Sequence, residues 1–194
     1  MSEHHRDTIL WNAFRQGDRQ AFERLYQEYY AALYHYGHSV TPDTEFVRDG
    51  IQTLFIDLWR RRDHLHPTDR IKPYLYQGLR RLLVKELQKQ RKFSSQESYA
   101  DTLLPSPEEG AIILETAGFR QRKVQEAVQT LTQKQQEVIY LRFYENLDNQ
   151  TIATLMGITV NTVYNLASLA ISNLRSQLKN QKELFFLLLS FLLS

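Results

Sequence analysis

The 194-residue sequence contains no cysteine, which excludes disulfides, thiol catalysis and thiolate metal sites. Glycine and proline are also sparse, with 7 and 5 residues, and this favours long helices over many short strands. The formal net charge is only +2. Hydrophobic residues nevertheless make up 42% of the chain, enough to build folded cores, so disorder throughout the chain is not expected.

Long apolar runs are scarce as well. The one such run, residues 184–193, has ten residues, whereas a helix that spans a bilayer needs about 20. The first eight residues are polar, so no secretory signal is predicted. We therefore expect a cytoplasmic protein without stable membrane insertion. The run 184–193 has no polar face, and we expect it to pack against its own domain or bind a partner rather than lie on a membrane surface.

Charge is distributed unevenly along the chain. Residues 60–92 hold eleven basic and three acidic side chains, whereas residues 93–110 hold four acidic and no basic ones. The second stretch also contains Ser and Pro without apolar periodicity, which indicates a linker. The predicted organisation is a domain over residues 1–92, a linker over 93–116, a second domain over 117–180 and an apolar tail over 181–194.

Apolar residues recur every three to four positions in both domains, which predicts an all-α fold of two helical domains. In the first domain, Asp18 and Asp43 are suited to cap helices, and a third helix is predicted from about Ile71 to Lys92, after Pro67. In the second domain, helices are predicted near residues 117–130, 134–145, 149–156 and 160–179.

The strongest local pattern is a helix-turn-helix over residues 149–168. Gly157 occupies the turn, where a positive φ is usually needed, and Asp148 and Thr159 are suitable N-caps. Such a unit inserts the start of its second helix into a DNA major groove, although a helical hairpin that binds nothing has the same pattern. The shared core would contain Ile152, Met156, Ile158, Val163 and Leu166. The side chains that would reach DNA are Thr159, Asn161, Thr162, Tyr164, Asn165 and Ser168, followed by Arg175 as the first cation of this helix.

The basic helix before the linker is a second candidate for nucleic-acid contact. Its net charge with the preceding residues, +8 over residues 60–92, exceeds what solubility needs, and Tyr74, Tyr76 and Trp59 could stack on exposed bases. The alternative is a solvated helix face with tyrosines in the core. The predicted contact set is Lys72, Tyr76, Arg80, Arg81, Lys85, Lys89 and Lys92.

The helix over residues 47–62 has a regular inward stripe formed by Val47, Ile51, Leu54, Phe55 and Leu58. Its outer face shows Asp49, Gln52, Thr53 and Asp57. Taken alone, an exposed polar face of this kind is usually only solvated.

Enzyme chemistry is not expected. The sequence has no Gly-rich phosphate loop, nucleophile elbow or HExxH motif, and its carboxylates are scattered. We therefore predict no catalytic residues, no cofactor and no metal site. His35 and His38 share a helix face without obvious further ligands, so they are expected to be partly buried or solvated. His64 and His66 fall in a predicted loop, where contact with DNA and no contact at all both remain open.

The order of these segments resembles a known family. DGIQTLFIDLWRRR is followed by IKPYLYQGLRRLLVKELQKQRK, an acidic linker and LTQKQQEVIYLRFYENLDNQTIATLMGITVNTVYNLASLAISNLRSQL. Over roughly residues 8–180, this resembles the extracytoplasmic-function sigma factors, the small two-domain members of the bacterial sigma-70 family.

The resemblance implies a partner for each face. The first domain would be sigma region 2, whose outer helix face would dock on the clamp helices of core RNA polymerase. The loop from Asp63 to Lys72 and the basic helix after it would open the minus-ten promoter element and hold a flipped base. The second domain would be sigma region 4, which reads the minus-thirty-five element. The residues implied for polymerase contact are Asp49, Gln52, Phe55, Asp57 and Trp59. An anti-sigma factor is a further partner that the resemblance admits.

The sequence departs from the family pattern at several positions. Thr53 replaces an acidic residue, Arg81 replaces the Asn of an Arg-Asn pair, Lys85 replaces an acid, and Tyr164 stands where Lys or Arg is usual. These departures bear on the strength of polymerase docking and on the promoter recognised.

Two other functions remain open at this point: a DNA-binding regulator that does not join the polymerase, and an adaptor that binds no DNA and acts through its apolar tail.

Overall fold

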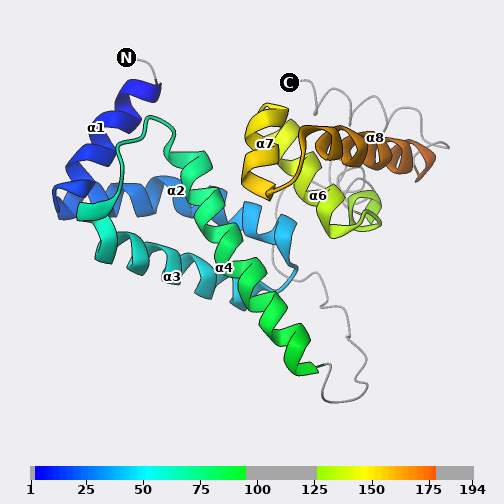
Figure 1. Cartoon of the computed structure of the whole chain (residues 1–194), viewed down its shortest axis with the longest axis horizontal. Helices are drawn as coiled ribbons and strands as arrows, with labels where there is room; N and C mark the ends of the chain where they lie inside the picture. The colour runs from blue at the N-terminus through cyan, green and yellow to red at the C-terminus, as the bar shows by residue number, and fades with distance from the viewer. Residues whose placement is uncertain (1–2, 95–125, 178–194) are drawn as a thin grey trace, which may run out of the picture. The chain divides into compact units, whose positions relative to one another are not determined.

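The computed structural model describes residues 3–94 and 126–177, which form one compact unit each (Figure 1). Side chains are described for residues 5–90 and 126–177. Every regular element in these ranges is helical, which confirms the predicted all-α fold. The predicted linker lies outside the described residues except for its first two positions, and the apolar tail lies wholly outside them. The domain boundaries therefore stay a prediction.

The first unit consists of four α-helices and one short 3-10 turn. Their bounds are α1 Glu3–Arg15, α2 Arg19–Val40, α3 Thr44–Arg61, η1 Arg62–His64 and α4 Ile71–Ser94. Asp18 caps α2 by accepting hydrogen bonds from the backbone N–H groups of residues 20 and 21 at 2.8 and 3.3 Å. Asp43 caps α3 by accepting from the Phe46 N–H at 3.0 Å. The two predicted caps are therefore confirmed, and α4 follows its predicted course to two residues beyond Lys92.

Sequence periodicity did not predict α1, although this helix supplies two of the largest core side chains. Trp11 and Phe14 are fully buried, and their rings lie 5.3 Å apart. With only a few apolar positions among its polar residues, α1 lacks the long stripe that marks α2 and α3. Its packing therefore depends on the rest of the unit rather than on a pattern of its own.

The helices α3 and α4 pack closely because a glycine on each faces a leucine on the other. A Cβ atom placed on Gly50 would lie 2.8 Å from Leu83 Cδ2, and one placed on Gly78 would lie 2.7 Å from Leu54 Cδ1. Real Cβ atoms essentially never come so close to a neighbour. The two glycines therefore set how near the helices can approach.

The second unit contains α6 Gln133–Ile139, the π-helical turn η2 Tyr140–Tyr144, α7 Asn149–Met156 and α8 Val160–Gln177. Residues 126–129 are helical as well, which is the described part of the helix predicted near 117–130. The helix predicted over 134–145 is correct in position, but its second half winds as a π-helix. A π-helical turn carries more residues per turn than an α-helix, and such turns often occur at functional sites.

The predicted helix-turn-helix is present. Gly157 has φ 66°, and α7 and α8 meet at a bend of 102°. Asp148 caps α7 through the Thr151 N–H at 2.9 Å, and Thr159 accepts from the Thr162 N–H at 3.2 Å at the start of α8. The shared core differs in part from the prediction. Ile152, Met156 and Val163 are buried as expected, whereas Ile158 and Leu166 are half-buried and the small Ala167 and Ala170 are buried instead.

Within the described residues, no single helix is long and apolar enough to cross a membrane, although α7 and α8 taken together would pass the same test of length and composition.

Candidate functional site

The outer face of α3 presents the polar residues that the sequence placed there. Asp49, Gln52 and Thr53 are exposed, and Asp57 is half-buried. Phe55 requires a correction, because its side chain is only 3% exposed and packs with Tyr26 at a ring distance of 4.9 Å. It belongs to the core stripe, for which it was also predicted, and it is not available for polymerase contact in this structure.

Trp59 links the outer face of α3 to the core. Its ring is half-buried and lies 5.0 Å from the ring of Phe22. The Arg62 guanidinium sits 4.5 Å from the centre of the indole, and Arg62 Nη1 donates to the Trp59 carbonyl oxygen at 2.7 Å. Part of the Trp59 side chain therefore remains accessible at the end of the face, beside a cation.

Sequence reasoning missed an apolar residue at the centre of this face. Ile56 is 50% exposed and follows Gln52 and Thr53 by four and three positions, so all three lie on one side of α3. An isoleucine interrupts the polar face at helical spacing, a signal that the sequence carries but that was overlooked. An exposed apolar side chain surrounded by polar groups is a suitable anchor for a protein partner.

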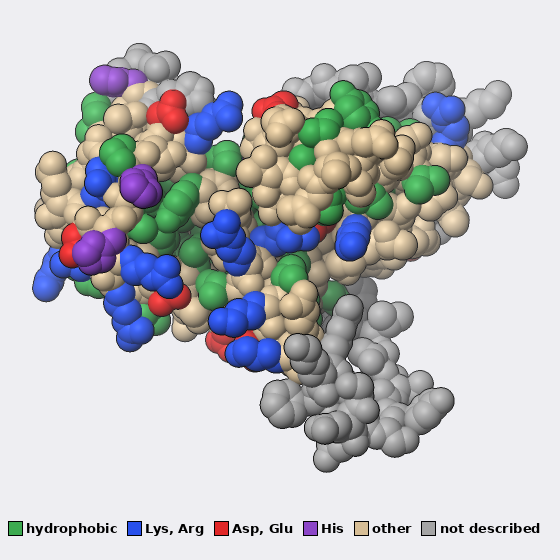
Figure 2. Space-filling view, viewed as in Figure 1, with side chains coloured by type: hydrophobic (Ala, Val, Ile, Leu, Met, Phe, Trp, Pro, Cys, Tyr) green, Lys and Arg blue, Asp and Glu red, His purple; other side chains and the backbone are tan. Residues whose placement is uncertain are grey.

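The helix α4 presents a cationic face. Arg81 and Lys85 are exposed and one helical turn apart, and Lys89 continues the row while it pairs with Glu86 at 2.8 Å. Figure 2 shows Lys and Arg side chains, in blue, along the course that α4 takes in Figure 1. The Lys92 side chain lies outside the described residues. Tyr74, 37% exposed, falls on the same side of the helix as Arg81 and Lys85.

Other predicted nucleic-acid residues of α4 are placed differently. The Tyr76 ring is 1% exposed and stacks on Tyr36 at 4.4 Å, so it cannot stack on a base in this structure, and this prediction is wrong. Lys72 and Arg80 are half-buried, and the Lys72 ammonium lies 6.0 Å from the centre of the Tyr76 ring. Because successive residues of a helix differ by about 100° in direction, Arg80 and Arg81 do not share one face.

In the second unit, the start of α8 carries the residues predicted to enter a DNA groove. Asn161, Asn165 and Ser168 are exposed, and the Tyr164 side chain is 53% exposed. Thr162 is half-buried, and its hydroxyl lies 2.8 Å from the hydroxyl of Thr159. Both threonines therefore support the helix start as well as facing solvent. Arg175 lies in the last turn of α8, eleven residues beyond Tyr164, or about 16 Å along the axis.

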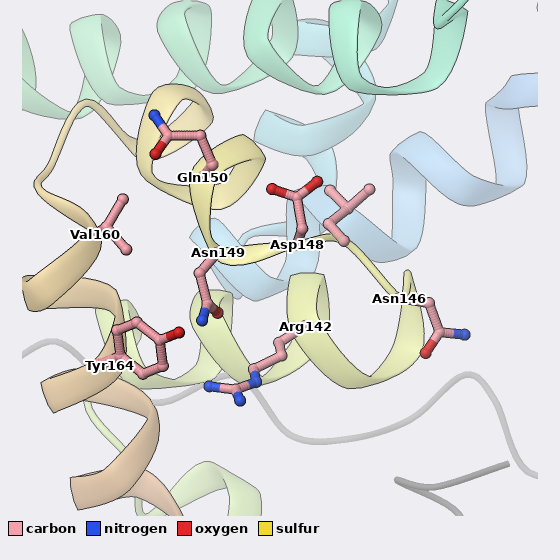
Figure 3. Close-up of a pocket in the computed structure, with 8 residues that line it drawn as sticks. Arg142, Asn146, Asp148, Asn149, Gln150, Val160 and Tyr164 are labelled. Carbon is pink, nitrogen blue, oxygen red and sulfur yellow. The ribbon is translucent and has the colours of Figure 1, made fainter.

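A cation that α8 itself lacks is supplied by η2. The Arg142 guanidinium lies 5.8 Å from the centre of the Tyr164 ring. Arg142, Asn149 and Tyr164 line one open hollow between η2, α7 and α8 (Figure 3). Sequence reasoning missed Arg142, because the contact depends on a turn that lies outside the helix-turn-helix pattern. Position 164, where the family that the sequence resembles usually has a cation, thus carries an aromatic ring with a guanidinium beside it.

Two family models match the chain. The model described as Sigma-70 region 2 matches residues 25–93, and the one described as Sigma-70, region 4 matches residues 121–174. No curated protein matches the sequence significantly.

Two solved structures share the fold. One is the sigma factor RpoE in complex with the anti-sigma factor NepR from Bartonella quintana, with a TM-score of 0.64 and 18% identity over 82% of this chain and 98% of that chain. The other is CnrH in complex with the cytosolic domain of CnrY, with a TM-score of 0.60 and 20% identity over 90% of this chain and 98% of that chain.

Proposed function

The chain belongs to the sigma-70 family. From this premise we propose that it is a member of the extracytoplasmic-function group that docks on core polymerase through α3, binds an unpaired promoter strand along α4 and reads duplex DNA with α8. The matched regions cover 123 of the 194 residues and contain all three faces. Members of this family bind core RNA polymerase and direct it to promoters. The proposal depends mainly on the two different exposed faces of unit 1. The outer face of α3 is polar with one exposed isoleucine, whereas the exposed face of α4 is cationic.

The proposed polymerase contact is the face formed by Asp49, Gln52, Thr53, Ile56 and Asp57. Fully burying an isoleucine side chain contributes about 1.5–3 kcal/mol, so covering the exposed half of Ile56 would contribute roughly half of that, still at least as much as a typical exposed ion pair. Ile56 would therefore supply much of the affinity, while Asp49 and Asp57 would orient the partner. Thr53, which departs from the family's acidic residue, removes one charge from this face but leaves the anchor beside it unchanged.

The proposed contact with the unpaired promoter strand is the α4 face with Tyr74, Arg81 and Lys85. An exposed tyrosine beside two cations can stack on a base while the cations neutralise phosphates. Duplex DNA is the proposed ligand of α8, where Asn161, Asn165 and Ser168 offer hydrogen bonds to base edges and Arg142 offers the charge. No bond is made or broken by any of these contacts, so the proposed function includes no catalysis.

Run-off transcription with core polymerase tests the function. We expect transcripts from a cognate promoter only when the chain is present, and we expect Ile56→Asp to weaken binding to core polymerase about tenfold or more. The matched control is Ile9→Asp, because Ile9 is also an exposed isoleucine of unit 1, with 52% exposure on α1. Equal transcription with and without the chain would contradict the proposal. Duplex binding without polymerase binding would instead support a regulator that acts outside the polymerase.

Partner and compartment follow from the same premise. The two structural neighbours were solved with a protein bound to the sigma factor or to CnrH, in the first case an anti-sigma factor. We propose that a protein of this kind restrains the present chain by competing for the α3 or α4 face. Polymerase and promoter DNA are in the bacterial cytoplasm, which is therefore the proposed site of action.

A further inference from the structure

The connection between η1 and α4 is held by its backbone to one side of α1. Trp11 Nε1 donates to the His66 carbonyl oxygen at 2.9 Å, and Arg15 Nε donates to the Leu65 carbonyl oxygen at 2.6 Å. Asp7 Oδ2 accepts from the Ile71 N–H at 3.2 Å. The three side chains are spaced four residues apart, so they lie along one side of α1. Figure 1 shows the connection passing beside this helix.

Burial makes these contacts costly to break. Trp11 is fully buried and Asp7 is only 8% exposed. Asp7 Oδ1 also accepts from the Tyr29 hydroxyl at 3.0 Å, so its carboxylate is fixed from two sides. A buried donor or acceptor that loses its partner carries an unfavourable desolvation cost. The loop backbone is consequently held in one conformation by a helix that belongs to neither of its flanking elements.

Several side chains of the loop are open to solvent. His64, His66 and Arg70 are exposed, while the backbone carbonyl groups of residues 65 and 66 point to α1. The same helix also steadies the start of α4, because Asp7 caps its first residue and the Trp11 ring lies 5.0 Å from the ring of Tyr74. The exposed edge of Tyr74 belongs to the cationic face described above. Thus α1 orders one end of that face without being part of it.

We propose that α1 is a positioning element for single-stranded DNA, in which Asp7, Trp11 and Arg15 hold residues 65–71 ready for the strand. The inference rests on the proposed function of the α4 face and adds the residues that organise it. A loop that is ordered before binding loses less conformational entropy when the strand arrives, so the affinity rises without any new contact to DNA. The three residues act through the loop and touch no nucleotide themselves.

The test compares variants that remove one donor each. Trp11→Phe keeps an aromatic ring but loses the N–H group, and Arg15→Met keeps the alkyl chain but loses the guanidinium. Arg24→Met is the matched control, because Arg24 is exposed on α2 and has no hydrogen bond to the loop within residues 3–94. Each full-length variant is titrated with a labelled single-stranded promoter oligonucleotide and with copies of it that carry one abasic site at successive positions. Binding to core polymerase and amide hydrogen exchange over residues 64–72 are measured in parallel.

We expect Trp11→Phe and Arg15→Met each to weaken oligonucleotide binding about fivefold, the effect of losing roughly one hydrogen bond. We also expect faster exchange confined to the loop, unchanged binding to core polymerase, and a smaller loss of affinity at the abasic position to which the wild type is most sensitive. A general loss of folding would instead weaken polymerase binding too and would overturn the positioning role. Wild-type affinity in both variants would overturn it as well. Failure of the wild-type chain to bind any of the oligonucleotides would contradict the proposed function of the α4 face itself.

Discussion

At the scale of single residues, His38 is a titratable group whose neutral form is favoured by folding, because its pKa is lowered. Burial lowers the pKa of His38 below its ordinary value of 6.5, and the nearby His35 and Arg48 lower it further, while Asp43 opposes them. Its ring packs edge-on against Tyr34 at 4.6 Å. Of the two histidines noticed in the sequence, His38 is therefore half-buried against an aromatic ring, whereas His35 is exposed.

A pH dependence of stability follows from the lowered pKa of His38. The unfolded chain takes up the proton near pH 6.5, whereas the folded chain takes it up only at lower pH, so the contribution to stability is complete above about pH 6.5 and is lost as the pH falls through the folded pKa. We expect the urea midpoint of unit 1, followed by the fluorescence of Trp11 and Trp59, to fall between about pH 7 and pH 5. The control His38→Gln should show a smaller fall. A folded pKa of 6.5 or higher for His38 in an NMR titration would contradict this account.

At the scale of elements, the start of α7 depends on one carboxylate. Asp148 accepts from the Thr151 N–H at 2.9 Å and from the Thr151 hydroxyl at 2.8 Å. Replacing an N-cap aspartate with alanine typically costs about 1 kcal/mol. We expect Asp148→Ala to lower the unfolding free energy of the second unit by about that amount, whereas Asp148→Asn, which keeps an acceptor, should cost less.

The distribution of tryptophan makes the Asp148 measurement specific. Both tryptophans of the chain, Trp11 and Trp59, belong to the first unit, so their fluorescence reports on that unit, while far-UV circular dichroism reports on both. The substitution should shift the circular-dichroism transition and leave the fluorescence transition in place. A shift of both by the same amount would mean that the effect is not local to α7.

Short sequence patterns predicted the helix starts, because these depend on contacts between residues that are close in the sequence. Asp18, Asp43 and Asp148 mark helix starts because a capping side chain bonds to the backbone two or three residues later. The role of α1 is different in kind, since Trp11 and Asp7 bond to groups 55 and 64 residues away, and no spacing rule carries that information. Phe55 and Tyr76 show a related limit. An aromatic side chain suits a core and a binding surface equally, and only the packing of neighbouring helices decides between them.

At the scale of the whole molecule, the two units differ in charge. Residues 3–94 hold sixteen basic and twelve acidic side chains, whereas residues 126–177 hold three basic and four acidic ones. The near-neutral total of the chain therefore hides a positive first unit. Within the described part of the second unit, Arg142 is the cation that lies at the start of α8, and the hydrogen-bonding side chains of this helix carry no charge.

Salt dependence should separate the two modes of DNA binding. Each phosphate neutralised adds about 0.9 to the slope of log affinity against log salt for duplex DNA and about 0.7 for single strands. We expect Arg142→Met to reduce the duplex slope by about 0.9 and to leave the single-strand slope unchanged, and Arg81→Met to reduce only the single-strand slope by about 0.7. Titrations of the full chain from low to high salt measure both slopes. If each substitution changed both slopes equally, the assignment of the two ligands to α8 and α4 would be wrong.

The paired contacts of Gly50 with Leu83 and of Gly78 with Leu54 have a consequence for how this sequence can diverge. In one pair a leucine of α4 fits against a glycine of α3, and in the other a leucine of α3 fits against a glycine of α4. Together the two contacts therefore fix the rotation of each helix about its own axis. The surfaces proposed to contact the polymerase and the unpaired DNA strand lie on these same two helices. A larger residue at position 78 would therefore turn or separate the two surfaces unless position 54 became smaller at the same time. In related chains, we expect the exposed positions to vary with the binding partners. We expect the residues at positions 50 and 83 to change together, so that one is small where the other is large, and the same of positions 54 and 78.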